Sequence, residues 1–226
     1  MVTPASVITQ SDPRHLKLMH QVARARRRPA AIFIADLEGS TPLSRRLSTA
    51  SYFALGRRLV QAADRCVVDA GGIVGRHVGD GVVAFFLAEA LGTESAAARA
   101  CIDAALSLRA AVAGVALRSN LEPEDVGLRF GLRWGSTLYV GNTTTAGRNE
   151  VTGLGDEVNE GARIEACAGG RRALASKALI ERLDSSDAAA GLGLDPDRLT
   201  YTVLGDLETA TEEARRDAPS IAVGDI

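Results

Sequence analysis

Short apolar runs alternate with longer amphipathic stretches along this chain, and the alternation predicts its strands and helices. Residues 30–37 (AAIFIADL) form an apolar run typical of a buried strand. The segments 73–78 and 82–86 flank a turn in which Asp80 stands between two glycines, and this arrangement predicts a β-hairpin. Two further strands are predicted around Gly135, and residues 199–205 predict a late one.

Helical periodicity covers the stretches between these runs. Residues 49–70 repeat apolar side chains at helical spacing, and the glycine pair that follows provides a C-terminal stop. Residues 94–117 are rich in alanine, the strongest helix former. A further helix is expected from about Glu157 to the glycine pair at 169–170, and a short one within residues 176–183.

These elements follow the order strand, helix, strand, strand, helix, strand. The order predicts an α+β fold of the ferredoxin-like split βαβ type, with helices on one face of an antiparallel sheet. Residues 29–205 contain no Pro/Ser-rich linker, so we expect one domain there. Residues 1–28 are predicted to be a polar, partly helical extension whose basic end, RARRRP, is a solvated helix end. Residues 206–226 are predicted to be a polar, frayed tail.

Composition and charge narrow the class of protein. The formal net charge of −2 gives no reason to expect a nucleic-acid partner. Three widely separated cysteines, Cys66, Cys101 and Cys167, argue against a disulfide framework or a zinc site and suit a reducing compartment. No apolar run reaches the length of a membrane span and the N-terminus has no signal-peptide core, so we expect a cytoplasmic protein.

Two aspartates are candidate metal ligands. Asp36 ends the first strand and Asp80 lies in the hairpin turn, and a split βαβ sheet brings both to one edge. After Asp36, the backbone N–H groups of Gly39, Ser40 and Thr41 could cradle an anion where a helix begins. Two carboxylates beside such a turn suit a pair of Mg²⁺ ions on a triphosphate. Either aspartate alone is explained equally well as a turn or helix-start residue.

Four segments together carry a more specific signal: FIADLEGST (33–41), HVGDG (77–81), LRFGLRWG (128–135) and GDEVNEGARIEA (155–166). In their order and intervals they resemble the motifs of the class III nucleotidyl cyclases, over roughly residues 30–205. The GG(D/E)EF hairpin of the related diguanylate cyclases is missing.

The resemblance implies a homodimer with active sites at its interface, acting on a nucleoside triphosphate with two divalent cations, Mg²⁺ or Mn²⁺. Asp36 and Asp80 match the family's metal-binding aspartates, and Arg129 matches the arginine that contacts the terminal phosphates. Asn159 and Arg163 match an Asn-x-x-x-Arg pair from the partner subunit, and their spacing puts both on one helical face. In the family the asparagine orients the ribose and the arginine stabilises charge on the α-phosphate. The ribose 3′-hydroxyl attacks that phosphate and pyrophosphate leaves.

The chain departs from the family at three positions. Adenylyl cyclases select their base with a Lys and an Asp or Thr, at positions held here by Arg76 and Thr152, and guanylyl cyclases carry Glu at the first. The family's triphosphate-binding lysine corresponds to Leu204. Arg76 only donates hydrogen bonds and is bulkier than Lys, which favours the carbonyl oxygens of uracil, with Thr152 accepting from N3–H. Adenine can also be accommodated, through N1, whereas guanine would need a carboxylate that Thr152 cannot supply.

Several functional hypotheses follow. The base-selecting pair favours a UTP-specific cyclase similar to the pyrimidine cyclases of bacterial antiphage signalling, whose cUMP would act on a separate effector protein. An adenylate cyclase making cAMP is the alternative. The departures also allow a catalytically degenerate module kept for nucleotide binding or dimerisation, or a plain ferredoxin-like interaction protein. In those cases Arg163 would form only a surface salt bridge with Glu160 or Glu165, while His77 is expected to be structural in any case.

Overall fold

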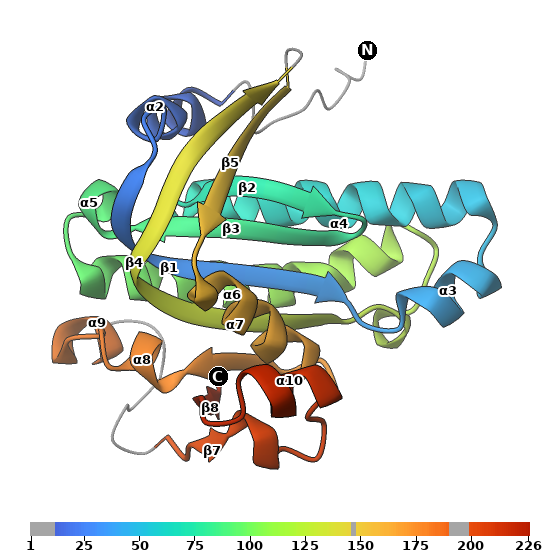
Figure 1. The fold of residues 1–226 in the computed structure, drawn as a ribbon. Helices are drawn as coiled ribbons and strands as arrows, with labels where there is room; N and C mark the ends of the chain where they lie inside the picture. The colour runs from blue at the N-terminus through green and yellow to red at the C-terminus, as the bar shows by residue number, and fades with distance from the viewer. Residues whose placement is uncertain (1–11, 146–147, 190–198) are drawn as a thin grey trace.

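The central feature of the fold is one mixed sheet, shown in Figure 1 by the computed structural model, which describes residues 12–145, 148–189 and 199–226. Its strands are β1 (Arg26–Leu37), β2 (Ile73–Val78), β3 (Gly81–Leu87), β4 (Leu128–Thr145), β5 (Arg148–Leu154), β6 (Ala173–Ser176), β7 (Thr202–Val203) and β8 (Ala222–Asp225). The order β2-β3-β1-β4 with antiparallel pairing is that of a split βαβ fold. The predicted α+β fold class is therefore confirmed.

Helices cover both faces of this sheet (Figure 1). They are α2 (Pro13–Gln21), α3 (Ser40–Arg46), α4 (Thr49–Asp69), α5 (Ala88–Leu91), α6 (Glu94–Leu117), α7 (Asp156–Ala166), α8 (Lys177–Ile180), α9 (Ser185–Ala189) and α10 (Glu212–Asp217), with the short 3₁₀ turns η1 (Pro123–Asp125) and η2 (Leu204–Asp206). α4 and α6 pack on one face, and α2 and α7 pack on the other. The prediction of helices on one face only was therefore wrong.

The central strand β1 explains why the sequence shows a continuous apolar run here. Ala31 and Phe33 point toward the core under α4 and α6, whereas Ile32 and Ile34 point toward the core under α2 and α7. A strand covered on both faces must be apolar at successive positions. Phe33 anchors the larger core, with its ring centroid 6.4 Å from that of Phe86.

Local signals set the ends of the two long helices. The Ser48 side chain accepts from the backbone N–H of Ser51 to cap α4, and Thr93 caps α6 in the same way. Gly71, at φ 81°, ends α4 in a conformation that glycine adopts without strain. Among the described residues only α6 is long and apolar enough to cross a membrane, and half of that stretch is buried within the fold. It is a core helix of this domain.

The arginine-rich segment near the N-terminus begins β1 and is not the solvated helix end that was predicted. Arg28 is only 2% exposed, forms an ion pair with Glu89 and donates to the carbonyl oxygens of Gln21 and Arg24. These contacts tie α2 to the start of the sheet, because a buried guanidinium needs acceptors for its N–H groups.

β4 is a single strand that runs through Gly135, where two strands were predicted. It continues into a hairpin with β5, which was not predicted. The pairing of β4 with β1 shifts between Arg28 and Ala30, at Pro29. Proline lacks a backbone N–H, so a ladder hydrogen bond is lost there and a single long strand can bend across the sheet.

Residues 206–226 complete the fold, so the predicted frayed tail was wrong. β8 pairs antiparallel with β6 and with β7, while β6 pairs parallel with β4. Ala214 of α10, Ala218 just after that helix and Val223 of β8 are buried in a cluster with Ile164 of α7. Although this segment is polar overall, it can complete the β6-β8-β7 edge of the sheet because its few apolar residues pack inward.

Candidate active site

The sheet brings Asp36 and Asp80 to one edge. Asp36 lies near the end of β1, directly after Ala35, which pairs with Val82 of β3. A Cβ atom placed on Gly81 would lie 2.8 Å from Oδ1 of Asp36, so the Asp36 carboxylate packs against the hairpin turn that holds Asp80. The close approach is possible because position 81 is a glycine.

The environment of Asp80 favours a bound cation. Burial raises the pKa of Asp80 above its ordinary value, and the negative charge of Asp36 adds to the shift. The Tyr52 hydroxyl donates to Oδ2 of Asp80 at 3.3 Å. A carboxylate whose charge is penalised by burial and by a neighbouring carboxylate gains strongly from a cation.

The donor set fits magnesium better than zinc. Within the described ranges, His, Cys, Asp and Glu form no group of three or more that could hold a metal ion. Two carboxylates completed by substrate phosphates and water are the usual ligands of Mg²⁺, whereas a structural zinc site needs four protein ligands. Asp36 and Asp80 therefore fit the predicted divalent cations.

Arg129 lies directly beside Asp36, to which it is paired across β1 and β4. Its Nη2 atom donates to Oδ2 of Asp36 at 3.0 Å and lies 3.0 Å from Oε1 of Glu165. Glu165 is 8% exposed, and burial raises its pKa to about 7, although the charge of Arg129 opposes the shift. The predicted phosphate-binding arginine is thus shared between two carboxylates.

Glu165 is the site residue that the sequence reasoning missed as a functional candidate. It was considered only as a surface partner of Arg163, but it pairs with Arg129 instead. The spacing of Gly161, Ile164 and Glu165 marks the buried face of α7. An acidic residue in that register is the signal that could have found it, because buried carboxylates are rare without a partner.

Of these groups, Asp36 and Glu165 line a cleft of about 350 Å³ that α7 shares with β1, β2 and β3. The polar side chains that line it are those of Asp36, Arg76, Asn159 and Glu165. The cleft therefore joins a predicted metal ligand, a predicted base-selecting residue and a predicted catalytic residue within one chain.

Arg163 points elsewhere. Its Nη2 atom donates to Oδ2 of Asp217 in α10 at 3.1 Å. Glu160, the other suggested partner of Arg163, pairs instead with Arg133 of β4 at 2.8 Å. Neither predicted salt bridge of Arg163 forms. Asn159, one turn earlier in α7, is exposed at the cleft.

The remaining predicted residues lie around this edge. Gly39, at φ 69°, precedes α3, and Ser40 and Thr41 form its first turn. Thr152 is on β5, next to β2, since a Cβ on Gly75 would lie 2.9 Å from the carbonyl oxygen of Val151. Gly75 and Val151 are therefore in close contact, and Arg76 and Thr152 are the next residues on β2 and β5.

Two other residues considered in the sequence analysis, Leu204 and His77, make contacts that support the fold. Leu204 is fully buried in the cluster under α10, so the position aligned with the family's lysine offers nothing to a phosphate. His77 lies with Nε2 at 2.7 Å from Oδ1 of Asp64 in α4, which ties the hairpin to that helix.

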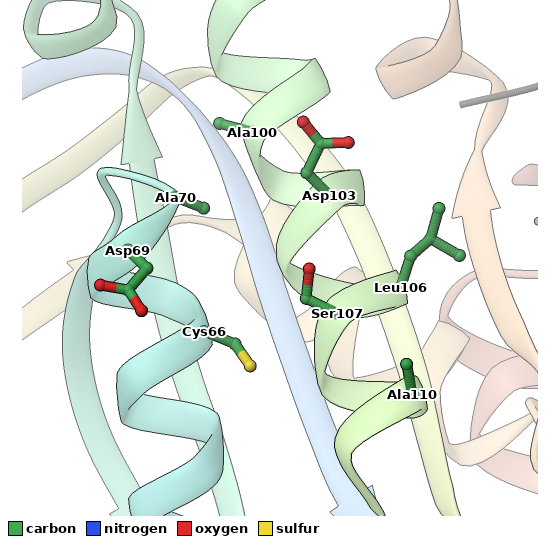
Figure 2. Close-up of a pocket in the computed structure, with 8 residues that line it drawn as sticks. All are labelled: Cys66, Asp69, Ala70, Ala100, Asp103, Leu106, Ser107 and Ala110. Carbon is green, nitrogen blue, oxygen red and sulfur yellow. The ribbon is translucent and has the colours of Figure 1, made fainter. Parts of the chain in front are cut away.

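A second, wider cleft of about 690 Å³ lies between α4 and α6 (Figure 2). Small side chains line most of it, with Asp69 and Asp103 on the two helices. None of the predicted site residues lines this cleft. It therefore offers carboxylates that can serve as controls for those of the candidate site.

Comparison with solved structures identifies the fold. The adenylyl cyclase CyaB from P. aeruginosa superposes with a TM-score of 0.67 at 20% identity, covering 90% of this chain and 96% of that one. The guanylate cyclase domain of RhGC from Catenaria anguillulae, solved with GTP, gives a TM-score of 0.64 at 16% identity, covering 90% and 97%. The non-canonical dimeric guanylyl cyclase domain of the RhoGC fusion protein from Blastocladiella emersonii gives a TM-score of 0.64 at 16% identity, covering 90% and 96%.

Neither protein-family profiles nor curated proteins gave a match to the sequence. The structural likeness covers nearly all of the chain and of its neighbours. The chain therefore has the fold of a class III nucleotidyl cyclase catalytic domain, as the four sequence segments predicted. A fold alone does not assign the reaction, which has to be argued from the site.

Proposed function

We propose, from this cyclase fold and the residues at its sheet edge, that the protein is a metal-dependent nucleotidyl cyclase. It would convert a nucleoside triphosphate into a 3′,5′-cyclic nucleotide and pyrophosphate. The observation that carries the proposal is the convergence of Asp36 and Asp80 beside Arg129, at one edge of the sheet. Two carboxylates and a guanidinium at one point suit a bound cation and the phosphates of its nucleotide.

Each residue has a distinct part in the proposed mechanism. Asp36 and Asp80 would hold two divalent cations, Mg²⁺ or Mn²⁺, which neutralise phosphate charge and make the ribose 3′-hydroxyl more acidic. Arg129 would bind the terminal phosphates. Asn159 would orient the ribose and Arg163 would stabilise the charge that develops on the α-phosphate.

The covalent change itself is simple. The 3′-oxygen forms a bond to the α-phosphorus as the bond to the bridging oxygen breaks, and the hydroxyl proton is released. Pyrophosphate carries away the electron pair of the broken bond. Positioning and charge stabilisation therefore account for most of the rate, as in other phosphoryl transfers.

A homodimer would complete the site. Arg163 points to α10 and away from the cleft of its own chain, which suits a role at the site of a partner subunit. In this arrangement the metal-binding edge of one subunit would face α7 of the other. Asn159, exposed at the rim, is accessible to such a partner.

For the base we propose uracil, with adenine as the alternative. Arg76 lines the cleft and can only donate hydrogen bonds, and Thr152 can accept one. Uracil offers two carbonyl oxygens and an N3–H that match this pair. The product cUMP would then act on a separate effector in the cytoplasm, as in antiphage signalling, whereas cAMP would indicate an ordinary second-messenger enzyme.

The test is to incubate the protein with Mn²⁺ and all four ribonucleoside triphosphates and to identify products by mass spectrometry. Asp36→Asn should abolish the product, while Asp103→Asn, in the second cleft, should leave it unchanged. A cyclic nucleotide made equally well by Asp36→Asn would contradict the mechanism. Nucleotide binding without any product would favour the degenerate binding module.

A further inference from the structure

Arg129 has two acidic partners and bonds them differently. Its Nη2–H is aligned on Oδ2 of Asp36 as a hydrogen bond, at 3.0 Å. Oε1 of Glu165 lies at the same distance from Nη2 but accepts no aligned hydrogen bond. Arg129 therefore gives its aligned hydrogen bond to the predicted metal ligand, and Glu165 attracts it only through charge.

The burial of Glu165 calls for an explanation. Its side chain is almost fully buried, on the face of α7 that packs against β4. A buried carboxylate is costly unless it is paired, and Arg129 is the cation beside it. A glutamine of nearly equal volume would pack there without that cost, so packing alone does not account for the charge.

A cation on Asp36 changes the balance between the two partners. Arg129 and a divalent ion would both carry positive charge at one carboxylate, and they would repel each other. This repulsion weakens the bond of the guanidinium to Asp36 and favours its transfer to another acceptor. Glu165 is already within ion-pair distance, so it can accept Arg129 after a small rotation of the side chain.

We propose that Glu165 is a positioning residue that takes Arg129 from Asp36 when a cation binds, and thereby sets the affinity of the metal site. This inference rests on the proposed function, because it takes Asp36 as a metal ligand. Glu165 itself touches neither metal nor substrate in this scheme. It acts through Arg129, which it holds beside the site for the phosphates.

The experiment measures Mn²⁺ binding without nucleotide, by electron paramagnetic resonance, together with the Mn²⁺ dependence of cyclase activity. Glu165→Gln should weaken Mn²⁺ binding about tenfold. Arg129 then has no second carboxylate to accept it, and the charged hydrogen bond lost at Asp36 is not replaced. Activity at saturating Mn²⁺ should change much less than the Mn²⁺ concentration for half-maximal activity. Glu165→Asp, which keeps the charge, should recover part of the affinity and covers the case in which Glu165→Gln fails to fold.

Two controls separate this role from general damage. Glu160→Gln removes an ion pair to β4 from the same helix, without contact to Asp36, and should leave Mn²⁺ affinity unchanged. In an Arg129→Met background, Glu165→Gln should have no further effect, because the competitor for Asp36 is gone. An unchanged Mn²⁺ affinity in folded Glu165→Gln, or an equal loss in the Arg129→Met background, would overturn the proposal.

The outcomes also distinguish this inference from the proposed function. If Asp36→Asn binds Mn²⁺ as well as the wild type, Asp36 is not a ligand and both proposals fall. If Asp36-dependent binding occurs without cyclisation, the cyclase proposal fails, while the direct binding measurement still decides the role of Glu165.

Discussion

Gly131→Ala is expected to disturb the packing that carries the candidate site. Gly131 lies near the start of β4, where α7 packs against it. A Cβ atom there would overlap the backbone N of Glu165 and the carbonyl O of Gly161, and would lie 2.8 Å from Cα of Glu165. All three atoms belong to the backbone of α7, so no side-chain rotation can relieve the overlap.

The size of the effect follows from these distances. Ordinary carbon contacts begin at about 3.5 Å, so α7 must move away from β4 by about 1 Å. Overpacking of this kind typically costs about 1–3 kcal/mol, and a rigid backbone neighbour places Gly131→Ala at the upper end. Because α7 also carries Asn159 and Arg163, a shift of about 1 Å can lower the rate about a hundredfold.

Urea unfolding and cyclase assays on the same samples test both expectations. Gly56→Ala is the matched control, since nothing lies within 4 Å of a Cβ atom at that position in α4. Alanine there should stabilise the protein by about 0.5–1 kcal/mol through helix propensity. If Gly131→Ala lost less than about 0.5 kcal/mol and kept full activity, the close contact of α7 with β4 would be refuted.

Three further predictions concern buried groups. Burial raises the pKa of Glu165 from 4.5 to about 7, so stability is lost as the pH rises between these two values, and the loss is complete above about pH 7. Glu165→Gln should therefore gain in free energy of unfolding, relative to wild type, between about pH 5 and about pH 8; a pH-independent difference in urea unfolding would contradict this. Phe33→Ala, fully buried against Phe86 and Phe130, should cost about 3–5 kcal/mol in the same assay, and a loss below about 1 kcal/mol would mean that this core is not closely packed. Burial also raises the pKa of the Cys101 thiol, so iodoacetamide should modify it only on unfolding, and rapid labelling of the native protein would contradict its burial.

Much of the fold was predictable because local patterns and tertiary packing agree. The run 30–37 became the central strand, the turn around Asp80 became a hairpin, and the alanine-rich stretch became α6. Ser48 and Thr93 cap their helices with side chains that the sequence displays openly. In each case the signal comes from residues a few positions apart in the chain, so the sequence alone is enough to predict the element.

The errors share a different cause. β8 is a short strand held by pairing with β6, which lies far from it in the chain, so its own residues carry little signal. The basic segment before residue 29 was expected at a helix end, but Glu89, far away in the chain, pairs with Arg28 and helps to bury it at the start of β1. Charge and polarity alone cannot distinguish a solvated arginine from one whose partners come from elsewhere in the chain.

For the candidate site, the sequence by itself determined the chemical types: two aspartates, Arg129 and the pair on α7. Only the tertiary structure decided how these charges are shared. It placed Arg129 at 3.0 Å from both Asp36 and Glu165, and it turned Arg163 toward Asp217. Ion pairs between residues far apart in the chain depend on distances of a few ångströms, and those distances are set by the packing of α7 and α10 and by no local pattern.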